Sequence, residues 1–472
     1  MPATPSDQAG LEAIVLAAGQ GKRMRSRLPK VLHELAGKPL LAHVLDAAAQ
    51  LQPDCVHVVI GHGGQQVREA LAERKTLQWV QQEQQRGTGH AVLQALPQVT
   101  STAMVLVLLG DVPLVQADTL RACVAAADSK TMAFVTAEPA NPAALGRVVR
   151  DEAGEVAAVV EFRDATPAQR AIGEINSGIM ALPKVLLEEL LSGLSTDNAQ
   201  GEYYLTDIVA GARQRGLRVV GVPATSEHEV AGINDRAELA RLERHHQQAL
   251  AQQLMAAGAT LADPARLDIR GEVTVGEDCF VDVNVVFTGQ VVLGAGVSVG
   301  PGCVIADSRL GDGVRVDAHT VVEGAIVAPR CTLGPFARIR PGTELGEAVK
   351  IGNFVETKKA RLGPGTKASH LTYLGDAVLG ENCNVGAGTV TCNYDGVNKH
   401  PTTIGDGVFV GTNSTLVAPL EIADGAYLGA GSTITSPVAQ GDLAVGRARQ
   451  RNIQGWVRPD RRKPKDDAEG QS

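Results

Sequence analysis

The sequence predicts a Rossmann-like α/β domain, then a helical connector, then a parallel β-helix. Strand and helix patterns alternate over about the first 235 residues. A polar helical pattern follows from Ala237, and from Ile269 to Ile434 an aliphatic residue returns every sixth position in three long runs. With 472 residues the chain is also too long for one ordinary core. We expect domain boundaries at 1–236, 237–262 and 263–456, with a flexible tail over 457–472.

The first expected strand starts at Leu11 and runs into a loop at Gly19 that continues through Lys22, Arg23 and Lys30. Backbone N–H groups among cationic side chains can hold phosphates. The loop has neither the ending of a Walker A loop nor the third glycine of a dinucleotide fingerprint. On spacing alone, a solvated basic loop is an equally good interpretation.

The next elements alternate in the same way: a helix over 40–51, a strand over 55–60, a helix over 65–73 and a strand over 104–109. Asp111 follows the last of these strands, where parallel sheets place ligands and metal ions, although an aspartate there can also cap a turn. A polar loop over 81–90 suits hydrogen bonding to a flat heterocycle, or an ordinary surface loop. Polar clusters resembling the rim of an active site end later apolar runs at 146–148, 161–164, 174–178 and 232–235.

The six-residue period fits neither a helix nor a half-buried strand. It fits short strands joined by tight turns, three to a coil, with glycine allowing the corners. An irregular β-sandwich would not keep this register over so many repeats. Because such a rod exposes flat faces and edges, we expect a homo-oligomer.

Composition limits the partners and the compartment. The net charge is -8, the pI is near 5.8 and aromatic residues make up 3%, so no nucleic-acid partner is expected. The seven cysteines lack metal-binding spacing, which indicates reduced thiols. No apolar run is long enough to cross a membrane, and no signal peptide is recognised. We expect a cytoplasmic protein.

Two groups of motifs resemble known enzymes. The run Leu16-Ala-Ala-Gly-x-Gly-x-Arg-Met24, followed by Leu28-Pro-Lys30, is similar to the signature of nucleotidyltransferases that activate sugar 1-phosphates. The segments 367–376, 384–388 and 391–396 resemble the acetyltransferase half of the bacterial family of bifunctional N-acetylglucosamine-1-phosphate uridyltransferase/glucosamine-1-phosphate N-acetyltransferases. The resemblance covers nearly the whole chain.

This resemblance implies a homotrimer with a left-handed β-helix. It implies acetyl transfer from acetyl-CoA to glucosamine 1-phosphate, then uridylyl transfer from UTP with Mg²⁺. The product would be UDP-N-acetylglucosamine, a precursor of peptidoglycan and lipopolysaccharide.

For the uridyltransferase half, the resemblance implies phosphate contacts from Arg23 and Lys30, and Mg²⁺ ligands in Asp111 and Asn234, both oxygen donors as this ion prefers. The full implied nucleotide and sugar-phosphate site is Leu16, Ala17, Ala18, Gly19, Arg23, Lys30, Gln82, Gly87, Thr88, Gly146, Glu161, Asn176 and Asn234. Of these, Gln82, Gly87 and Thr88 would contact uracil, and Gly146, Glu161 and Asn176 the sugar. The chain departs from the family at Lys22, Leu109 and Phe162.

For the acetyltransferase half, the resemblance implies that His370 is the general base, because a protonated amine must lose a proton near neutral pH. The implied sugar contacts are Arg340, Lys358, Tyr373, Asn384, Asn393 and Tyr394. The implied acetyl-CoA contacts are Ala387, Thr412, Ala430 and Arg447, with Thr412 in place of the usual serine. His319 and His400 lack such a context and are interpreted as structural.

Three other functions remain as alternatives. The nearest is a sugar-1-phosphate nucleotidyltransferase with a non-catalytic β-helix, which predicts a second half without the motif around His370. A zinc β-helix enzyme would need histidines in a shared repeat register, which this chain lacks. A non-catalytic scaffold would not need Lys30 or Asp111. We also expect the two sites to act independently, so that cutting near Pro264 leaves each half active.

Overall fold

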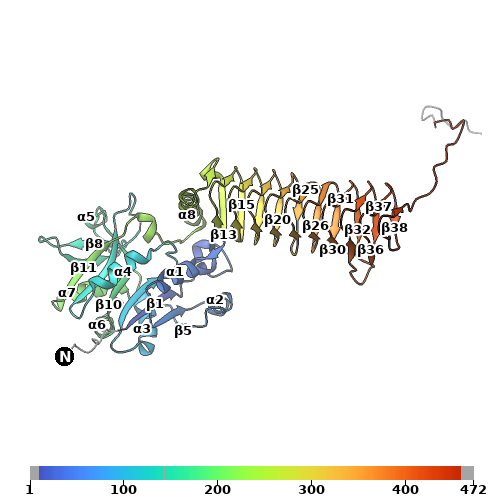
Figure 1. The fold of residues 1–472 in the computed structure, drawn as a ribbon. Helices are drawn as coiled ribbons and strands as arrows, with labels where there is room; N and C mark the ends of the chain where they lie inside the picture. The colour runs from blue at the N-terminus through green and yellow to red at the C-terminus, as the bar shows by residue number, and fades with distance from the viewer. Residues whose placement is uncertain (1–9, 143, 459–472) are drawn as a thin grey trace, which may run out of the picture. The chain divides into compact units, whose positions relative to one another are not determined.

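The computed structural model describes residues 10–142 and 144–458 (Figure 1). The chain divides into two compact units, 1–309 and 310–472. The tail expected over 457–472 lies, from residue 459 onward, outside the described residues.

The first unit contains a nine-stranded mixed sheet with the order β11-β7-β10-β6-β1-β4-β5, to which β8 and β9 are added. β1 (Leu11–Ala17) lies between β4 (Cys55–Ile60) and β6 (Met104–Leu109), parallel to both. The predicted strands at these places and the Rossmann-like fold are confirmed. β10 runs antiparallel to β6 and β7, a direction that was not predicted. The other strands of this sheet are β5 (Leu77–Gln81), β7 (Thr131–Ala137), β8 (Arg147–Arg150), β9 (Val156–Val160), β10 (Ile175–Pro183) and β11 (Arg218–Pro223).

Helices cover both faces of this sheet because its central strands are apolar on both sides. Val15 and Leu106 belong to one buried cluster with α1 and α4, whereas Ile14 and Val107 belong to another with α3, α6 and α7. Alternate residues of one strand thus enter different cores. The helices are α1 (Leu40–Ala49), α2 (Gly64–Ala70), α3 (Thr88–Ala95), α4 (Ala117–Ala126), α5 (Pro167–Arg170), α6 (Lys184–Leu191) and α7 (Ile208–Gln214). The short elements are η1 (Lys22–Met24), η2 (Lys30–Leu32), β2 (Glu34–Leu35), β3 (Lys38–Pro39), η3 (Leu96–Gln98), η4 (Leu205–Asp207) and η5 (Glu227–Val230).

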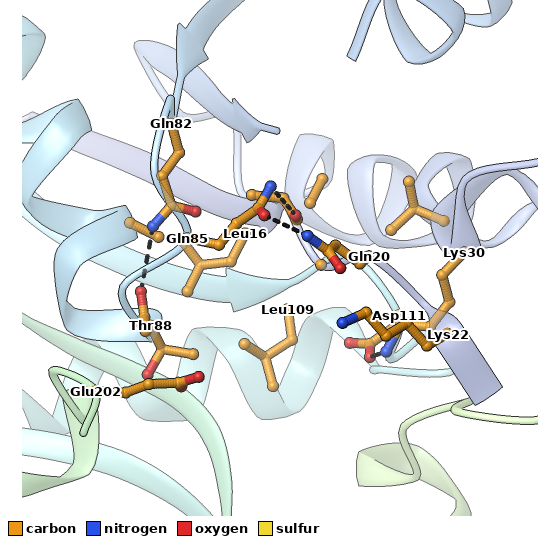
Figure 2. Close-up of a pocket in the computed structure, with 16 residues that line it drawn as sticks. Leu16, Gln20, Lys22, Lys30, Gln82, Gln85, Thr88, Leu109, Asp111 and Glu202 are labelled. Carbon is orange, nitrogen blue, oxygen red and sulfur yellow. Dashed lines mark hydrogen bonds and ion pairs between the residues drawn. The ribbon is translucent and has the colours of Figure 1, made fainter. Parts of the chain in front are cut away.

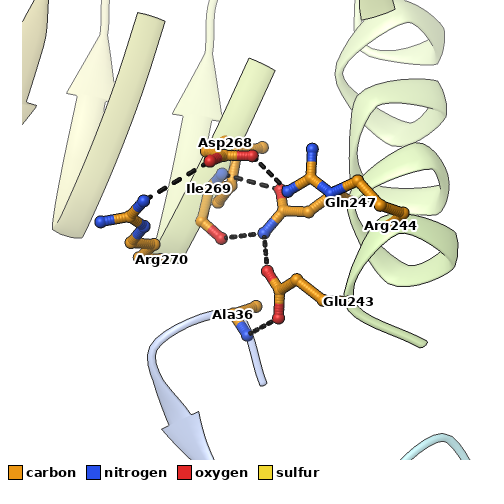
Figure 3. Close-up of polar contacts among 7 residues, drawn as sticks. All are labelled: Ala36, Glu243, Arg244, Gln247, Asp268, Ile269 and Arg270. Carbon is orange, nitrogen blue, oxygen red and sulfur yellow. Dashed lines mark hydrogen bonds and ion pairs between the residues drawn. The ribbon is translucent and has the colours of Figure 1, made fainter. Parts of the chain in front are cut away.

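The predicted helical connector is α8 (Arg236–Ala256), capped by the Asp235 side chain, which accepts hydrogen bonds from two backbone N–H groups. The buried Gln247 amide exchanges two hydrogen bonds with the backbone of Ile269, of 2.6 and 2.7 Å (Figure 3). Glu243 accepts from the backbone N–H of Ala36 in the β2–β3 turn at 2.7 Å. Glu243 and Gln247 are four residues apart and therefore lie on the same face of α8. This face of the helix contacts both the β2–β3 turn and β13 (Leu267–Val275).

The β-helix is confirmed as parallel stacks of short strands. In the second unit, three parallel stacks run through β19-β22-β25-β28-β31-β34-β37-β39, through β20-β23-β26-β29-β32-β35-β38 and through β21-β24-β27-β30-β33-β36. The recurring aliphatic residues meet in register, as Leu333 with Ile351 and Val410 with Leu428, and they are buried. Each such side chain contributes about 1.5–3 kcal/mol to stability.

The first unit contains the first coils of the β-helix. Their elements are β12 (Thr260–Leu261), η6 (Pro264–Arg266), β13, β14 (Phe280–Val281), β15 (Val285–Leu293), β16 (Ser298–Val299) and β17 (Val304–Ala306). The later strands are β18 (Arg309–Leu310), β19 (Arg315–Val316), β20 (Val321–Glu323), β21 (Ile326–Val327), β22 (Thr332–Leu333), β23 (Arg338–Ile339), β24 (Glu344–Leu345), β25 (Lys350–Asn353), β26 (Glu356–Lys358), β27 (Arg361–Leu362), β28 (Lys367–His370), β29 (Tyr373–Gly375), β30 (Ala377–Leu379), β31 (Asn384–Val385), β32 (Val390–Cys392), β33 (Thr402–Ile404), β34 (Phe409–Val410), β35 (Thr415–Val417), β36 (Leu420–Ile422), β37 (Tyr427–Leu428), β38 (Thr433–Ile434) and β39 (Leu443–Ala444). Across the described part of the chain, no helix has the length and apolar character to span a membrane.

Acid should destabilise the first unit through His43. This side chain donates to the carbonyl of Leu35 at 2.9 Å and packs edge-on against His246 of α8. Burial lowers the pKa of His43 from 6.5 to about 4. The unfolded chain therefore binds the proton first, so the stabilisation is complete above pH 6.5 and is lost as pH falls toward 4. We expect a loss of about 2 kcal/mol in the free energy of unfolding at pH 5. Denaturant titrations at pH 7 and 5 measure it, and a His43→Gln variant with the same pH dependence would contradict this assignment.

Candidate active sites

A pocket of about 570 Å³ opens at the carboxyl ends of β1, β5 and β6 (Figure 2). Open parallel sheets bind ligands at this edge. Nine residues of the predicted nucleotide and metal site meet there: Leu16, Ala17, Ala18, Gly19, Lys30, Gln82, Gly87, Thr88 and Asp111. The departures Lys22 and Leu109 line the same pocket.

One side of this pocket concentrates charge. The Lys30 ammonium forms an ion pair with the Asp111 carboxylate and lies 3.3 Å from Oδ1 of Asn234. Asn234 directly precedes the cap of α8, and its backbone N–H donates to Glu238 at 2.6 Å. Arg23 lines an adjoining hollow of about 250 Å³ together with Lys30 and Asn234. Cationic and oxygen-donor groups thus converge where a triphosphate and its counterion would need them.

The other side carries amides. Gln82 is buried, and its Nε2 donates to the carbonyl of Gly87 at 3.3 Å and lies 3.0 Å from Nδ1 of His90. With its nitrogen engaged, the Gln82 carbonyl is left as an acceptor. Gln20, Gln85 and Glu202 also line the pocket and were not predicted. The glutamine-rich run was a visible signal for Gln85, whereas nothing local marks Glu202.

A substitution at Gly87 provides a test of whether activity depends on the shape of the loop between β5 and α3. Its φ is +107°, and a methyl group there would lie 2.6 Å from the carbonyl oxygen of Tyr203. Gly87→Ala should therefore move the loop and lower the expected uridylyl transfer by about 100-fold. Pyrophosphate release measures it. The control is Gly154→Ala, which also has positive φ but meets nothing within 4 Å; equal losses in both variants would show general strain instead.

Gly146, Glu161 and Asn176 form a second group. The backbone N–H of Asn176 donates to the carbonyl of Gly146 at 3.0 Å, and Glu161 accepts from the Thr206 hydroxyl at 3.0 Å. Burial raises the pKa of Glu161. None of the three lines the pocket described above, but Gly178, two residues after Asn176, packs against Leu109, which does.

Phe162 is one of the three departures from the family pattern, and its cationic neighbours explain its presence. The guanidinium groups of Arg147 and Arg170 lie 5.3 and 4.8 Å from its ring centre. Such contacts attract a cation to an aromatic face. Phe162 therefore packs against two arginines.

In the second unit, His370 lies at the end of β28, next to Asn353 on the neighbouring coil. Its Nδ1 is 2.8 Å from Oδ1 of Asn353. A carbonyl oxygen only accepts, so Nδ1 carries the proton and Nε2 is left with a lone pair. The exposed imidazole is thereby set up as a proton acceptor. Asn353 was not predicted.

A cationic cluster lies around Lys358, at the end of β26. Lys399 lowers the pKa of Lys358, with smaller effects in the same direction from desolvation and then from Arg340, whereas Asp376 acts in the opposite direction. Arg340 also pairs with Glu356 at 2.7 Å, and Glu356 is in register with Tyr373. Lys358 thus has two cationic neighbours, an arrangement that favours the binding of an anion.

Lys399, which was not predicted, belongs to an outward hairpin between β32 and β33. The hairpin closes with a bridge between Tyr394 and Lys399, and His400 pairs with Asp395 at 2.7 Å. Asn393, at its base, donates to Asp376 at 2.5 Å. The hairpin thus brings Asn393 and Lys399 to the acidic and cationic groups around Lys358.

The predicted acetyl-CoA residues occupy successive coils at one corner. The backbone N–H of Asn413 donates to Ala387 at 2.7 Å, and that of Gly431 donates to Thr412 at 2.7 Å. A methyl group on Gly431 would lie 3.9 Å from Arg447. Ala387, Thr412, Ala430 and Arg447 therefore follow one line along the stack, while Asn384 is exposed in β31.

Comparison with known proteins gives matches over most of the chain. The family model of the MobA-like NTP transferase domain matches residues 13–176, that of the GMPPB C-terminal domain 269–367, and that of the bacterial transferase hexapeptide 401–436. The chain is 55% identical to the bifunctional protein GlmU of Marinobacter nauticus, over 95% of this chain and 99% of that protein. It is 53% identical to that of Pseudomonas entomophila (96% and 99%) and 51% identical to that of Alkalilimnicola ehrlichii (96% and 97%). A solved nucleotidyl transferase from Methanothermobacter thermautotroptrophicus has 21% identity and a TM-score of 0.38, covering 51% of this chain and 99% of that one.

Proposed function

The chain belongs to the bifunctional GlmU family, and from this premise we propose how its residues carry out two reactions. The enzyme transfers acetyl from acetyl-CoA to glucosamine 1-phosphate. It then joins N-acetylglucosamine 1-phosphate to UMP from UTP, which gives UDP-N-acetylglucosamine and pyrophosphate. The product serves cell-wall biogenesis. We place both reactions in the cytoplasm, in keeping with seven free cysteines.

For uridylyl transfer, the proposal rests on the convergence of Lys30, Asp111 and Asn234 in one pocket. The sugar phosphate attacks the α-phosphorus of UTP, so the protein has to position the reactants and neutralise charge. Arg23 and Lys30 supply cations for the phosphates. Gln82, Gly87 and Thr88 hold the uracil, and Gly146, Glu161 and Asn176 hold the sugar.

The residues present fit Mg²⁺. Asp111 and Asn234 offer hard oxygen donors, and the Lys30 ammonium already lies against both of them as an internal cation. We propose that these two side chains would hold the ion, with waters and phosphate oxygens completing its shell. When bound, it would supply positive charge to the triphosphate.

For acetyl transfer, the proposal rests on the pair of His370 and Asn353. Nε2 takes a proton from the sugar amine as nitrogen attacks the thioester carbonyl; the C–N bond forms, the C–S bond breaks, and the imidazolium returns its proton to the departing CoA thiolate. Asn353 keeps the proton on Nδ1. Arg340, Lys358 and Lys399 bind the sugar phosphate, with Tyr373, Asn384, Asn393 and Tyr394 around the sugar. Ala387, Thr412, Ala430 and Arg447 line the path of acetyl-CoA.

We propose a homotrimer in which a second copy covers an apolar ladder beside His370. Phe336, Phe354 and Leu371 stack on successive coils, at 49, 57 and 61% exposure. All three have φ between 48° and 56°, which is costly for bulky side chains. The two phenylalanine rings lie 5.5 Å apart and stacked. Exposed apolar groups held in a costly conformation are typical of an interface.

Phe354→Asp should convert the trimer to smaller species and lower acetyl transfer at least tenfold, because a charge would be buried at the interface. Light scattering on a sizing column measures the mass, and uridylyl transfer gives an internal reference. Ile326→Asp, on another face and 58% exposed, should remain trimeric. A trimeric Phe354→Asp protein would place the interface elsewhere.

One experiment tests the function and the proposed independence of the two sites. Release of CoA thiol and of pyrophosphate would be measured on the full chain and on a fragment ending at Arg309, where the compact units divide. This cut keeps Gln247 with Ile269, which a cut near Pro264 would separate. The full chain should release both products and the fragment only pyrophosphate. A full chain that releases only pyrophosphate would reduce the β-helix to a scaffold.

A further inference from the structure

His90 lies beside the nucleotide pocket, in the first turn of α3, and does not itself line that pocket. Its ring stacks on the ring of Tyr203, with the ring centres 6.4 Å apart. Its Nδ1 lies 3.0 Å from Nε2 of Gln82, and Gln82 does line the pocket. An effect of His90 on a bound nucleotide is therefore transmitted through the amide group of Gln82.

The loop of Gly87 determines which way this amide is turned. Gln82 is 3% exposed, and its backbone N–H donates to the carbonyl of Ile60 at 2.8 Å. Its Nε2 faces the carbonyl oxygen of Gly87 at 3.3 Å, a group that can only accept. The opposite orientation would bring two oxygens together and leave a buried acceptor unsatisfied. The nitrogen of Gln82 therefore faces the Gly87 loop.

His90 accepts the second N–H of the same amide. The NH₂ group of Gln82 has two hydrogens, and the one that is not directed at Gly87 points to Nδ1 of His90. Burial, followed by the nearby Arg86, lowers the pKa of His90 from its ordinary 6.5, so the ring is neutral at pH 7 and one nitrogen has a lone pair. The amide of Gln94 lies 3.4 Å from Nε2 and can present its oxygen to a proton there. Nδ1 is thus the nitrogen with the lone pair.

The oxygen of Gln82 is left to contact a nucleobase. Figure 2 shows the nitrogen of Gln82 turned toward the loop before Thr88, and the oxygen turned away from that loop. A carbonyl oxygen accepts from the N3–H of uracil, whereas cytosine has an unprotonated N3 at the same position, so that two acceptors would meet. A reversed amide would present its NH₂ group and favour cytosine instead. The orientation of this one amide therefore distinguishes the two bases.

We propose that His90 is a positioning residue that fixes the amide of Gln82 and thereby makes the enzyme select UTP over CTP. This inference rests on the proposed function, in which Gln82 contacts uracil. The hydrogen bond from Gln82 to Gly87 is the longer of the two, and the Gly87 carbonyl also accepts from the backbone N–H of Ala91 at 3.2 Å. His90 therefore supplies the closer of the two acceptors that orient the amide before the nucleotide binds.

His90→Leu tests this because it removes the acceptor and keeps an apolar side chain next to Tyr203. The KM for UTP should rise about tenfold, and the ratio of kcat/KM for UTP to that for CTP should fall about 10- to 100-fold. The kcat with UTP should stay within about threefold of the parent, because the groups around Lys30 are unchanged. Pyrophosphate release with each nucleotide measures these constants, and thermal unfolding shows whether the variant is folded.

His90→Asn is the matched variant, because Oδ1 of asparagine can accept where Nδ1 of histidine does. It should keep the preference for UTP within about threefold of the parent. If His90→Asn and His90→Leu lose the preference equally, His90 only fills space and the proposal is overturned. A folded His90→Leu variant with the preference of the parent would overturn it as well.

A double variant tests whether His90 acts through Gln82. Gln82→Leu should lower the preference for UTP, and adding His90→Leu should lower it no further, because the two residues act as one unit. A further loss in the double variant would contradict the proposed route. A parent that releases pyrophosphate from neither nucleotide would contradict the proposed function and this inference with it. A parent that uses UTP and CTP equally well would overturn this inference alone.

Discussion

Replacing His370 with alanine should lower acetyl transfer by at least about 100-fold and leave uridylyl transfer by the same chain unchanged. The hydrogen bond to Asn353 fixes the proton on Nδ1, so the free Nε2 is the base that the attacking amine needs. Removing the imidazole takes away this proton acceptor. Release of CoA thiol from acetyl-CoA and glucosamine 1-phosphate measures the effect.

His319 provides a control in the same β-helix; it stacks on Phe336 of the proposed trimer interface at a ring distance of 5.2 Å, so its variant is compared only after light scattering has shown it to be trimeric. His319→Ala should keep most of the acetyl transfer. Asn353→Ala should shift the pH profile of acetyl transfer, because the imidazole loses the partner that selects its tautomer. A His370→Ala enzyme with activity near that of the parent would rule out this base.

Replacing Lys30 with alanine should lower uridylyl transfer by about 100- to 1,000-fold, the usual cost of removing one preorganised charge-stabilising group. Lys30 is the side chain that touches both Asp111 and Asn234. Without Lys30, the oxygens of Asp111 and Asn234 lose the cation that lies against them. The phosphates of UTP also lose one of their cationic contacts. Pyrophosphate release from UTP and N-acetylglucosamine 1-phosphate measures the change.

Lys38→Ala is the matched control for this variant. Lys38 pairs with Asp46 and is absent from the lining of the pocket, so uridylyl transfer should stay within about twofold of the parent. Acetyl transfer should be unaffected in both variants. A Lys30→Ala loss below tenfold would contradict the phosphate role, and equal losses of both activities would indicate misfolding.

The sequence was most informative where chemistry and periodicity are local. The six-residue repeat determined the β-helix, because the same aliphatic position must face the core in every coil. The loop from Leu16 to Lys30 could be assigned to a phosphate site because strand, glycine and cations follow each other directly. Asp111 was found because it ends an apolar strand.

Other features depended on contacts between distant segments. Glu202 reaches the pocket from a loop more than a hundred residues after Gln85, and no local pattern marks it. The antiparallel direction of β10 is set by pairing, which an apolar run does not reveal. Asn353 could have been found: paired residues such as Lys350 and Lys367 are one coil apart, and Asn353 precedes His370 by the same interval.

The hairpin between β32 and β33 shows how this architecture can acquire new parts. From Lys367 to its partner Asn384 the coil takes 17 positions, whereas from Asn384 to Phe409 it takes 25. The additional residues leave the stack at a corner and return to it without shifting the register of the strands above. The stacked strands therefore keep their pairing when residues are inserted at a corner of a coil. A binding loop such as the one that carries Lys399 can be added there without rearranging the strands that support it.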